Sequence, residues 1–384
     1  MSRVGVMHVT DTLDAGGIER VAVNLCNLLP RERFRAYLCT TRRDGALADS
    51  VAPDVGRLRL SRRWRFDARA LRKFSSFVME HDIRIVHAHG SALFVSGLAS
   101  LLPPRPALVW HDHFGLPLET RSALLDRPLA RRARGVITVS EPLAEWSRRE
   151  LGVPPERVRY IPNFVCEPRQ NGHLPELPGA AGARVVCVAN LRPQKDHLTL
   201  VRAMALVVRR HPGAHLLVVG ASPDAAHRAR IEDEIARLGI SRSVTLLGER
   251  RDVHEVLGAC DVGVLSSVAE GLPLALIEYA SAGLASVATR VGQCAEVLDE
   301  GRAGLLVPPR DPDRLAEAIS SLLVSPVKLV VLGEILRRRA RRLYSAERIV
   351  GQVCEVYEQV LNSLNAHGAE GANGRAPGAN GRRG

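Results

Sequence analysis

Residues 262–288, VGVLSSVAEGLPLALIEYASAGLASVA, predict a strand, a loop, a helix and a second strand. The two end segments, residues 262–265 and 285–288, are short apolar runs of strand character. The segment between them is long enough to carry a crossover helix. Such a unit favours a parallel sheet, because parallel strands need a long connection that is usually helical.

The same alternation of apolar runs and amphipathic segments extends over most of the chain and predicts an α/β protein. Further strands are expected at residues 4–9, 83–87, 107–111, 135–139, 158–161, 185–189, 215–219 and 244–246. A segment rich in Pro, Gly and Asn divides them into two sets, each with its own sheet. The expected parts are a first Rossmann-like domain (1–165), a linker (166–183), a second Rossmann-like domain (184–343), a helix that is a candidate to cross back to the first domain (344–364) and a disordered tail (365–384).

Length and composition fit two ordinary domains and exclude several other classes. The chain has 384 residues, 46% of them apolar, and seven cysteines, an odd number without a CxxC pair. These cysteines predict reduced thiols and argue against a disulfide framework. The net charge is +12 but only 4% of residues are aromatic, so no nucleic-acid partner is expected. The start of the chain predicts a strand rather than a signal peptide, and the apolar stretch 92–110 is cut by prolines at 103, 104 and 106, so no membrane span is expected.

The strongest chemical signal is a pair of glutamates, Glu270 and Glu278, that flank a predicted loop-to-helix junction. Pro273 suits the first turn of a helix. Gly271 lets the backbone approach a ligand, and the free N–H groups of the turn after it favour phosphate or sugar oxygens. If the helix begins near Leu272, Glu278 lies about 9 Å along it. The simpler alternative is a capped helix with Glu278 as a solvated charge.

Three segments together resemble the family 4 glycosyltransferases. They are residues 270–312, which begin EGLPLALIEYASAGL, residues 190–197, NLRPQKDH, and residues 8–25, HVTDTLDAGGIERVAVNL. The resemblance covers roughly residues 4–360. It implies the GT-B architecture, two Rossmann-like parallel-sheet domains that face each other across a cleft. It also implies transfer of a sugar from a nucleoside diphosphate to a glycan or lipid-linked acceptor, with retention of anomeric configuration and without a metal.

Arg192 and Lys195 follow a predicted strand, so they are expected at the carboxyl edge of the second sheet. Two cations there can neutralise a departing diphosphate. Gly16 and Gly17 precede the first helix and are expected to let the donor or the acceptor approach its N-terminus. The first βα turn has no GxGxxG sequence, which argues against a nicotinamide-dependent enzyme.

Histidines gather at the ends of two predicted strands, as His87 and His89 and as His111 and His113. By resemblance, His111 is the active-site histidine that contacts the donor sugar. His113 stays open as the alternative, since one sequence does not fix the local register. These histidines lack a recognisable second ligand pair, so no zinc site is expected.

The resemblance also implies the remaining contacts of the donor. Gly271 and Leu272 belong to the donor-binding turn, Glu278 binds the ribose, and Gly248 and Arg250 border the base. Asp311-Pro312-Asp313 has the form of a metal-binding DxD segment, but it is interpreted as a helix start. No cofactor is expected. The alternative function is a non-catalytic regulator that binds nucleotide sugars on the same fold.

The predicted first domain carries a basic cluster at residues 57–73, which includes Arg69, Arg72 and Lys73. Two interpretations stay open, a contact with anionic lipid beside a lipid-linked acceptor and an ordinary solvated helix face. A cytoplasmic protein is expected, and the first interpretation implies that it lies at the inner face of the membrane. One segment departs from the family, because Gly292-Gln293-Cys294 stands where paired glycines are common.

Overall fold

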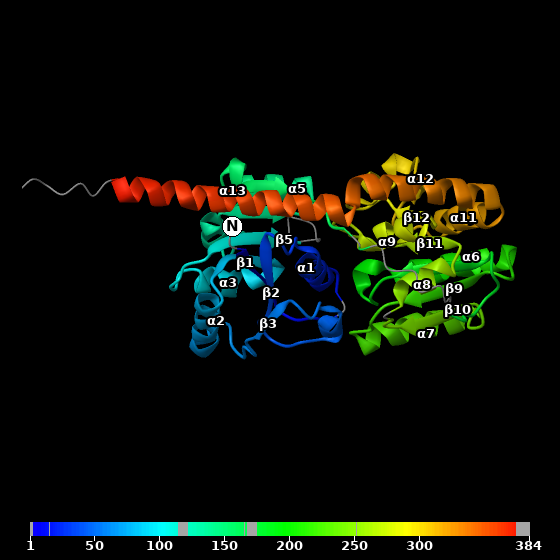
Figure 1. The fold of residues 1–384 in the computed structure, drawn as a ribbon. Helices are drawn as coiled ribbons and strands as arrows, with labels where there is room; N and C mark the ends of the chain where they lie inside the picture. Colours follow the sequence, from blue (N-terminus) through cyan, green and yellow to red (C-terminus); the bar gives the residue numbers. More distant parts are fainter. Residues whose placement is uncertain are drawn as a thin grey trace, which may run out of the picture.

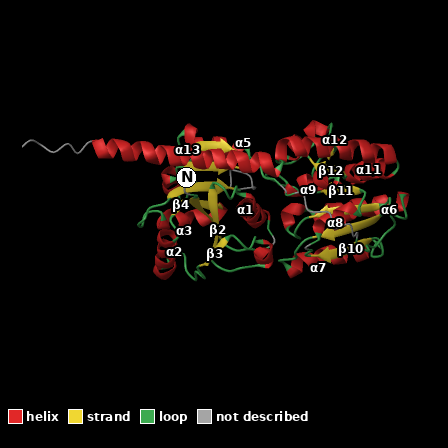
Figure 2. Cartoon of the chain, viewed as in Figure 1, coloured by secondary structure: helices red, strands yellow, loops and turns green. Residues whose placement is uncertain are grey.

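A computed structural model describes residues 3–373 of the chain, apart from residues 15, 114–121, 165, 167–174 and 251. The described residues form two α/β domains, each built around one parallel sheet with helices on its faces (Figures 1 and 2). The predicted fold class is confirmed.

The first sheet has the strand order β3-β2-β1-β4-β5-β6-β7, and all its strands are parallel. Its central strands are buried over nearly their whole length, as expected where helices cover both faces. The strands are β1 (Val4–Thr10), β2 (Phe34–Thr40), β3 (Gly56–Arg59), β4 (Ile83–His89), β5 (Ala107–Asp112), β6 (Gly135–Thr138) and β7 (Val158–Tyr160).

Polar side chains cap the first turns of two helices around this sheet. Asp67 accepts a hydrogen bond from the Ala70 N–H at the start of α2, and Ser140 accepts one from the Leu143 N–H at the start of α5. The helices are α1 (Gly17–Leu28), α2 (Ala68–Glu80), α3 (Leu93–Ala99), α4 (Arg127–Arg132) and α5 (Glu141–Arg149), with short 3₁₀ turns at Ala46–Ser50, Gly90–Ala92 and Pro155–Arg157.

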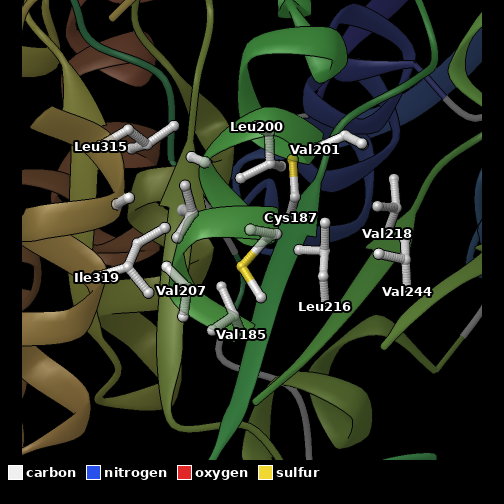
Figure 3. Close-up of a cluster of buried hydrophobic side chains, with 14 of the residues drawn as sticks. Val185, Cys187, Leu200, Val201, Val207, Leu216, Val218, Val244, Leu315 and Ile319 are labelled. Atoms are coloured by element: carbon white, nitrogen blue, oxygen red, sulfur yellow. The ribbon is translucent and has the colours of Figure 1, made fainter. Parts of the chain in front are cut away.

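The second sheet has the order β10-β9-β8-β11-β12-β13. Figure 3 shows one of its cores, in which Cys187 and Leu216 from the sheet pack with Leu200 and with Leu315 and Ile319. The strands are β8 (Arg184–Val188), β9 (His215–Val219), β10 (Val244–Gly248), β11 (Val262–Leu265), β12 (Ala285–Thr289) and β13 (Leu305–Val307). The helices are α6 (His197–Arg210), α7 (Ala225–Arg237), α8 (Val253–Gly258), α9 (Leu274–Ala282), α10 (Cys294–Val297), α11 (Pro312–Leu323) and α12 (Pro326–Tyr344), with 3₁₀ turns at Pro193–Lys195 and Asp299–Gly301.

The Asp311-Pro312-Asp313 segment is the start of α11, as predicted. The Asp311 side chain accepts a hydrogen bond from the Arg314 N–H, and Pro312 is the first residue of the helix. This segment therefore caps a helix.

The last helix, α13 (Ala346–Asn373), leaves the second domain and lies along the first (Figure 1). Val353, Tyr357 and Val360 share a core cluster with residues of the first sheet. The helix continues past residue 364, so the expectation that the tail is disordered from residue 365 is wrong for residues 365–373; residues 374–384 lie outside the described part. Of the expected linker, residues 167–174 also lie outside the described part.

No single helix among the described residues has both the length and the apolar composition of a membrane span. One pair of helical segments, Pro312–Leu323 and Pro326–Ala366, meets both criteria jointly, across a bend of 103°.

Candidate active site

A cavity of about 560 Å³ lies between the two domains, at the carboxyl ends of strands from both sheets. Ligands bind in this position in open parallel sheets. Most of the predicted site residues line it, namely Gly16, Gly17, Arg192, Lys195, Arg250, Glu270, Gly271, Leu272 and Glu278. His113 and Asn163 also line it, whereas Gly248 and His111 do not.

Glu270 lies in the loop between β11 and α9 and is held by two donors. Lys195 Nζ lies 2.5 Å from its Oε1, and Ser267 Oγ donates to the same oxygen at 2.5 Å. Only 8% of the Glu270 side chain is exposed, against 24% of that of Lys195. A carboxylate this buried needs such partners, because burial without them strongly disfavours its charge.

A second loop supports Glu270 from behind. Gly292 has a φ of +49°, and a Cβ built on it would lie 2.0 Å from the Glu270 carbonyl oxygen. The Gln293 N–H donates to the Gly271 carbonyl at 3.1 Å. These residues lie in the segment that departs from the family pattern. The glycine at 292 is therefore required by close backbone contact, while position 293 tolerates a larger residue that supports the loop through its backbone.

Helix α9 begins at Leu274, later than the predicted start near Leu272, because Pro273 has extended backbone angles and precedes the helix. Glu278 lies on this helix, 3.6 Å from Arg20 of α1. Burial raises the pKa of the Glu278 carboxyl above its usual value, and Arg20 opposes that shift. The pair joins the two domains along one wall of the cavity.

The start of α1 explains the two glycines. A Cβ on Gly17 would lie 3.1 Å from the Leu274 side chain, and one on Gly16 would lie 2.2 Å from the Glu19 carboxylate. Gly17 therefore lets the first turn of α1 approach α9 across the cavity. Burial raises the pKa of Glu19, which also lines the cavity.

The remaining second-domain residues differ in how they reach the cavity. Arg192 is exposed there, whereas Arg250 is held by Asp252 through contacts of 2.7 and 2.5 Å. Gly248 ends β10 with a φ of +70°, outside the cavity lining. The structure therefore gives Gly248 a role in chain geometry rather than at the cavity wall.

The histidine that reaches the cavity lies two residues later than the predicted one. His111 is 1% exposed and lies behind His113, with 4.0 Å between the two ring centroids. His113 lines the cavity, so it replaces His111 as the candidate active-site histidine. The physical reason is that β5 continues to Asp112, one residue further than predicted, so the strand meets the cavity at the next histidine of the same face.

Five histidines at three adjacent strands form one cluster, with His113 at the cavity and the other four behind it: His8, His87, His89, His111 and His113. Burial lowers the pKa of His8 and of His113 to about 3 and holds the pKa of the other three well below the usual value. The rings are therefore neutral at pH 7. The sequence indicated two histidine pairs, but the addition of His8 depends on the pairing of β1 with β4.

Comparisons with known proteins agree with this arrangement. Residues 15–167 match the model of Glycosyltransferase Family 4, and residues 182–325 match that of Glycosyl transferases group 1. An exopolysaccharide phosphotransferase from Streptomyces coelicolor is 31% identical over 277 residues, which are 71% of this chain and 28% of that protein. The chain spans 28% to 58% of the length of that protein and three other curated relatives.

Other similarities extend over nearly the whole chain. The UDP-Gal:alpha-D-GlcNAc-diphosphoundecaprenol alpha-1,3-galactosyltransferase of Escherichia coli is 24% identical over 388 residues, 94% of this chain and 98% of that protein. The structure of Anabaena HepE in complex with UDP and glucose has a TM-score of 0.80 at 21% identity and covers 93% of this chain and 100% of that one. With matching models over both domains and the expected two-sheet fold, the chain belongs to the family 4 glycosyltransferases of GT-B architecture.

Proposed function

We propose that this protein transfers a sugar from a nucleoside diphosphate to a glycan or lipid-linked acceptor, with retention of anomeric configuration. The observation that carries the proposal is the Lys195–Glu270 ion pair inside a cavity that both domains line. A cation and a carboxylate held together at the carboxyl edge of a parallel sheet match the two needs of sugar transfer. The leaving diphosphate gains negative charge, and the sugar ring gains positive charge.

In this proposal the donor lies mainly against the second domain. Arg192 and Lys195 bind the diphosphate, and the backbone at Gly271 and Leu272 approaches its oxygens. Glu278 accepts hydrogen bonds from the ribose. Arg250, which Asp252 orients, borders the base. The structural neighbour HepE, which was solved with UDP and glucose, supports this class of donor.

The sugar then lies between Glu270 and His113. As the bond between the sugar carbon and the phosphate oxygen breaks, the acceptor hydroxyl attacks the same face of the ring. Its proton passes to an oxygen of the leaving phosphate, and the configuration is retained. Glu270 has two candidate roles, electrostatic support of the developing positive charge and positioning of a sugar hydroxyl. Contacts from both domains let closure exclude water, which would otherwise compete as acceptor.

We also propose that the diphosphate needs no divalent cation, because Arg192 and Lys195 supply the positive charge. The rival function, a regulator that binds nucleotide sugars without turnover, would not need the Lys195–Glu270 pair at the reaction centre. The presence of this pair favours the transferase.

We also propose that the acceptor side faces a membrane surface, at the inner, cytoplasmic face. Around the basic cluster, Trp64 and Phe66 are 75% and 70% exposed, and Arg69 and Arg72 are exposed beside them. Basic residues mixed with exposed aromatic rings suit an interface with anionic lipid. Arg62 does not belong to this surface, because its side chain is 6% exposed and lies 3.5 Å from Asp11. The Escherichia coli relative is named as acting on a diphosphoundecaprenol-linked sugar, which supports a lipid-linked acceptor.

A two-step experiment tests the function. Thermal unfolding with UDP-, GDP- and ADP-linked sugars identifies the donor, because a ligand that binds the folded state raises the melting temperature by mass action. NMR of the product formed with lipid-linked acceptors then gives the anomeric configuration. Stabilisation without release of nucleoside diphosphate from any acceptor would favour the regulator, and inversion at the anomeric carbon would refute the retaining mechanism.

A further inference from the structure

The histidines behind the cavity wall form two overlapping groups with different hydrogen bonding. Strand register brings His8 opposite His87, and His89 opposite His111. In each of two triplets, His8-His87-His89 and His89-His111-His113, one ring nitrogen per residue lies within 4.8 Å of the others. His89 belongs to both triplets.

The first triplet is held together by the Tyr357 hydroxyl of α13. This hydroxyl lies 2.6 Å from His87 Nδ1 and 3.2 Å from His8 Nε2, and His8 Nδ1 lies 3.0 Å from His89 Nε2. Both ring nitrogens of His8, Nδ1 of His87 and Nε2 of His89 take part in these contacts. Nε2 of His87 has no partner among the described residues. These hydrogen bonds fix the orientation of the His89 ring.

The ring nitrogens of the second triplet have fewer hydrogen-bond partners among the described residues. His89 Nδ1 lies 3.1 Å from His113 Nε2, but neither ring nitrogen of His111 has a hydrogen-bond partner in the described part of the chain. A ring that is 1% exposed and has no hydrogen-bond partner among the described residues costs folding free energy, and a bound water or ion can satisfy such a group.

We propose that His89, His111 and His113 form a binding site for a late first-row divalent cation, with zinc as the reference ion, on the first-domain wall of the cavity. Three imidazole ligands suit zinc, copper or nickel and do not suit magnesium or calcium, which prefer oxygen. His113 lines the cavity, so the ion has a route of entry and keeps a fourth position open to the cavity. The site differs from the diphosphate position and does not depend on the proposed function.

Two features of the surroundings suit this triplet to metal binding. The Tyr357–His8–His89 chain orients His89 from behind, as outer hydrogen bonds orient the ligands of metal sites. His111 lies in β5 and His113 follows the last residue of that strand, and residues two apart along an extended segment point to the same side of the sheet. The sequence did not indicate this site, because His89 and His113 are separated by 24 positions and meet only when β4 pairs with β5.

Binding of zinc to the chelator-treated full chain tests the proposal without any measurement of turnover. We expect one equivalent of zinc to bind in competition with a chromophoric chelator, and cobalt in the same site to give the visible spectrum of a tetrahedral, nitrogen-ligated ion. His113→Asn and His111→Gln should each lower the zinc association constant by about 100-fold or more, since even outer partners of ligands contribute 10- to 100-fold. His113→Asn lies at the cavity and should fold, as circular dichroism would verify.

Two further variants decide which triplet binds the ion. His81→Asn removes a histidine of the same domain that lies outside the cluster and should leave zinc affinity unchanged. His87→Gln alters a residue of the first triplet only, so it should change zinc affinity much less than His111→Gln does. The proposal is overturned if no stoichiometric zinc binding is found, if His113→Asn and His111→Gln bind zinc as the unaltered chain does, or if His87→Gln has the larger effect.

Discussion

The second domain brings charged side chains to the cavity, whereas the first domain places the ring of His113 there, with four buried histidines behind it. Lys195 and Glu270 form an ion pair on the second-domain side. On the first-domain side, burial lowers the pKa of His113 to about 3, so its ring is neutral at pH 7. The charged exceptions of the first domain lie at the start of α1, where Arg20 faces Glu278. In the proposed function, this difference leaves stabilisation of developing charge to the second domain and positioning to the first.

The largest effect is expected from the reaction centre of the second domain. Glu270→Gln keeps the size of the side chain but removes its charge. If Glu270 supports the positive charge that develops on the sugar, kcat should fall by about 100-fold or more, with a small change in the donor KM. Steady-state kinetics with saturating donor measures this.

The control for Glu270 is Glu300→Gln, which removes an exposed carboxylate paired with Arg290 in the same domain. It should leave kcat unchanged. Because Lys195 and Glu270 are in contact, Lys195→Ala and the double variant complete a cycle whose interaction free energy should be large. An unaltered kcat in Glu270→Gln would mean that the reaction centre lies elsewhere.

On the neutral wall, His113→Asn should lower kcat by about 10-fold, the effect of one hydrogen bond of about 1–1.5 kcal/mol to the sugar. His111→Asn should affect the melting temperature more than kcat, since the ring is buried behind His113. Both variants are compared in kinetics and in thermal unfolding.

The pH dependence of kcat checks whether His113 acts as a neutral group. Its folded-state pKa of about 3 lies below its unfolded value, so the ring stays neutral from pH 5 to 8 and contributes no step there. A step near pH 6.5 that disappears in His113→Asn would show that the first domain also works through charge, and the contrast between the domains would fail.

Glu278 lies where the two domains meet, and its removal should affect binding rather than chemistry. If Glu278 binds the ribose, as proposed, that contact is equal in the ground state and the transition state, so Glu278→Ala should raise the donor KM by several-fold, about 10-fold at most, with kcat nearly unchanged. Arg20→Ala is the matched control, because it breaks the same 3.6 Å contact but removes no ribose ligand. Equal effects of both variants would indicate that the contact between the domains matters and not the ribose.

The same contrast explains what the sequence could predict. The second-domain residues follow one another in short segments, so Arg192, Lys195, Glu270 and Glu278 were found from motifs, and all four line the cavity. The first-domain wall depends on the length of β5 and on strand pairing. One residue of error at the end of that strand exchanges His111 for His113, and no local pattern indicates that His8 joins them. The contacts of Gly292 with the Glu270 loop are likewise visible only in three dimensions.

A smaller effect is expected on the outer surface of the first domain. Arg69→Ala and Arg72→Ala should each weaken binding to anionic vesicles by about five-fold at low salt, because one basic residue near such a surface contributes about 1 kcal/mol. Arg209→Ala, an exposed arginine at the end of α6 in the second domain, is the control. Vesicle sedimentation measures the effect, and equal binding to neutral vesicles would refute a role for the charges.

The smallest effect is expected from removal of metal ions. The second domain supplies cations of its own at the proposed diphosphate position, so excess EDTA should leave turnover essentially unchanged. If EDTA does abolish turnover, the ion that restores it shows which side of the cavity requires a metal. Turnover that EDTA abolishes and magnesium or manganese restores would mean that Arg192 and Lys195 do not suffice at the diphosphate, since oxygen-rich sites select these ions. Restoration by zinc alone would instead implicate the histidines of the first domain, because imidazole ligands do not select magnesium. Zinc added to the chelator-free enzyme should lower turnover, since an ion held by His113 withdraws that ring from the sugar.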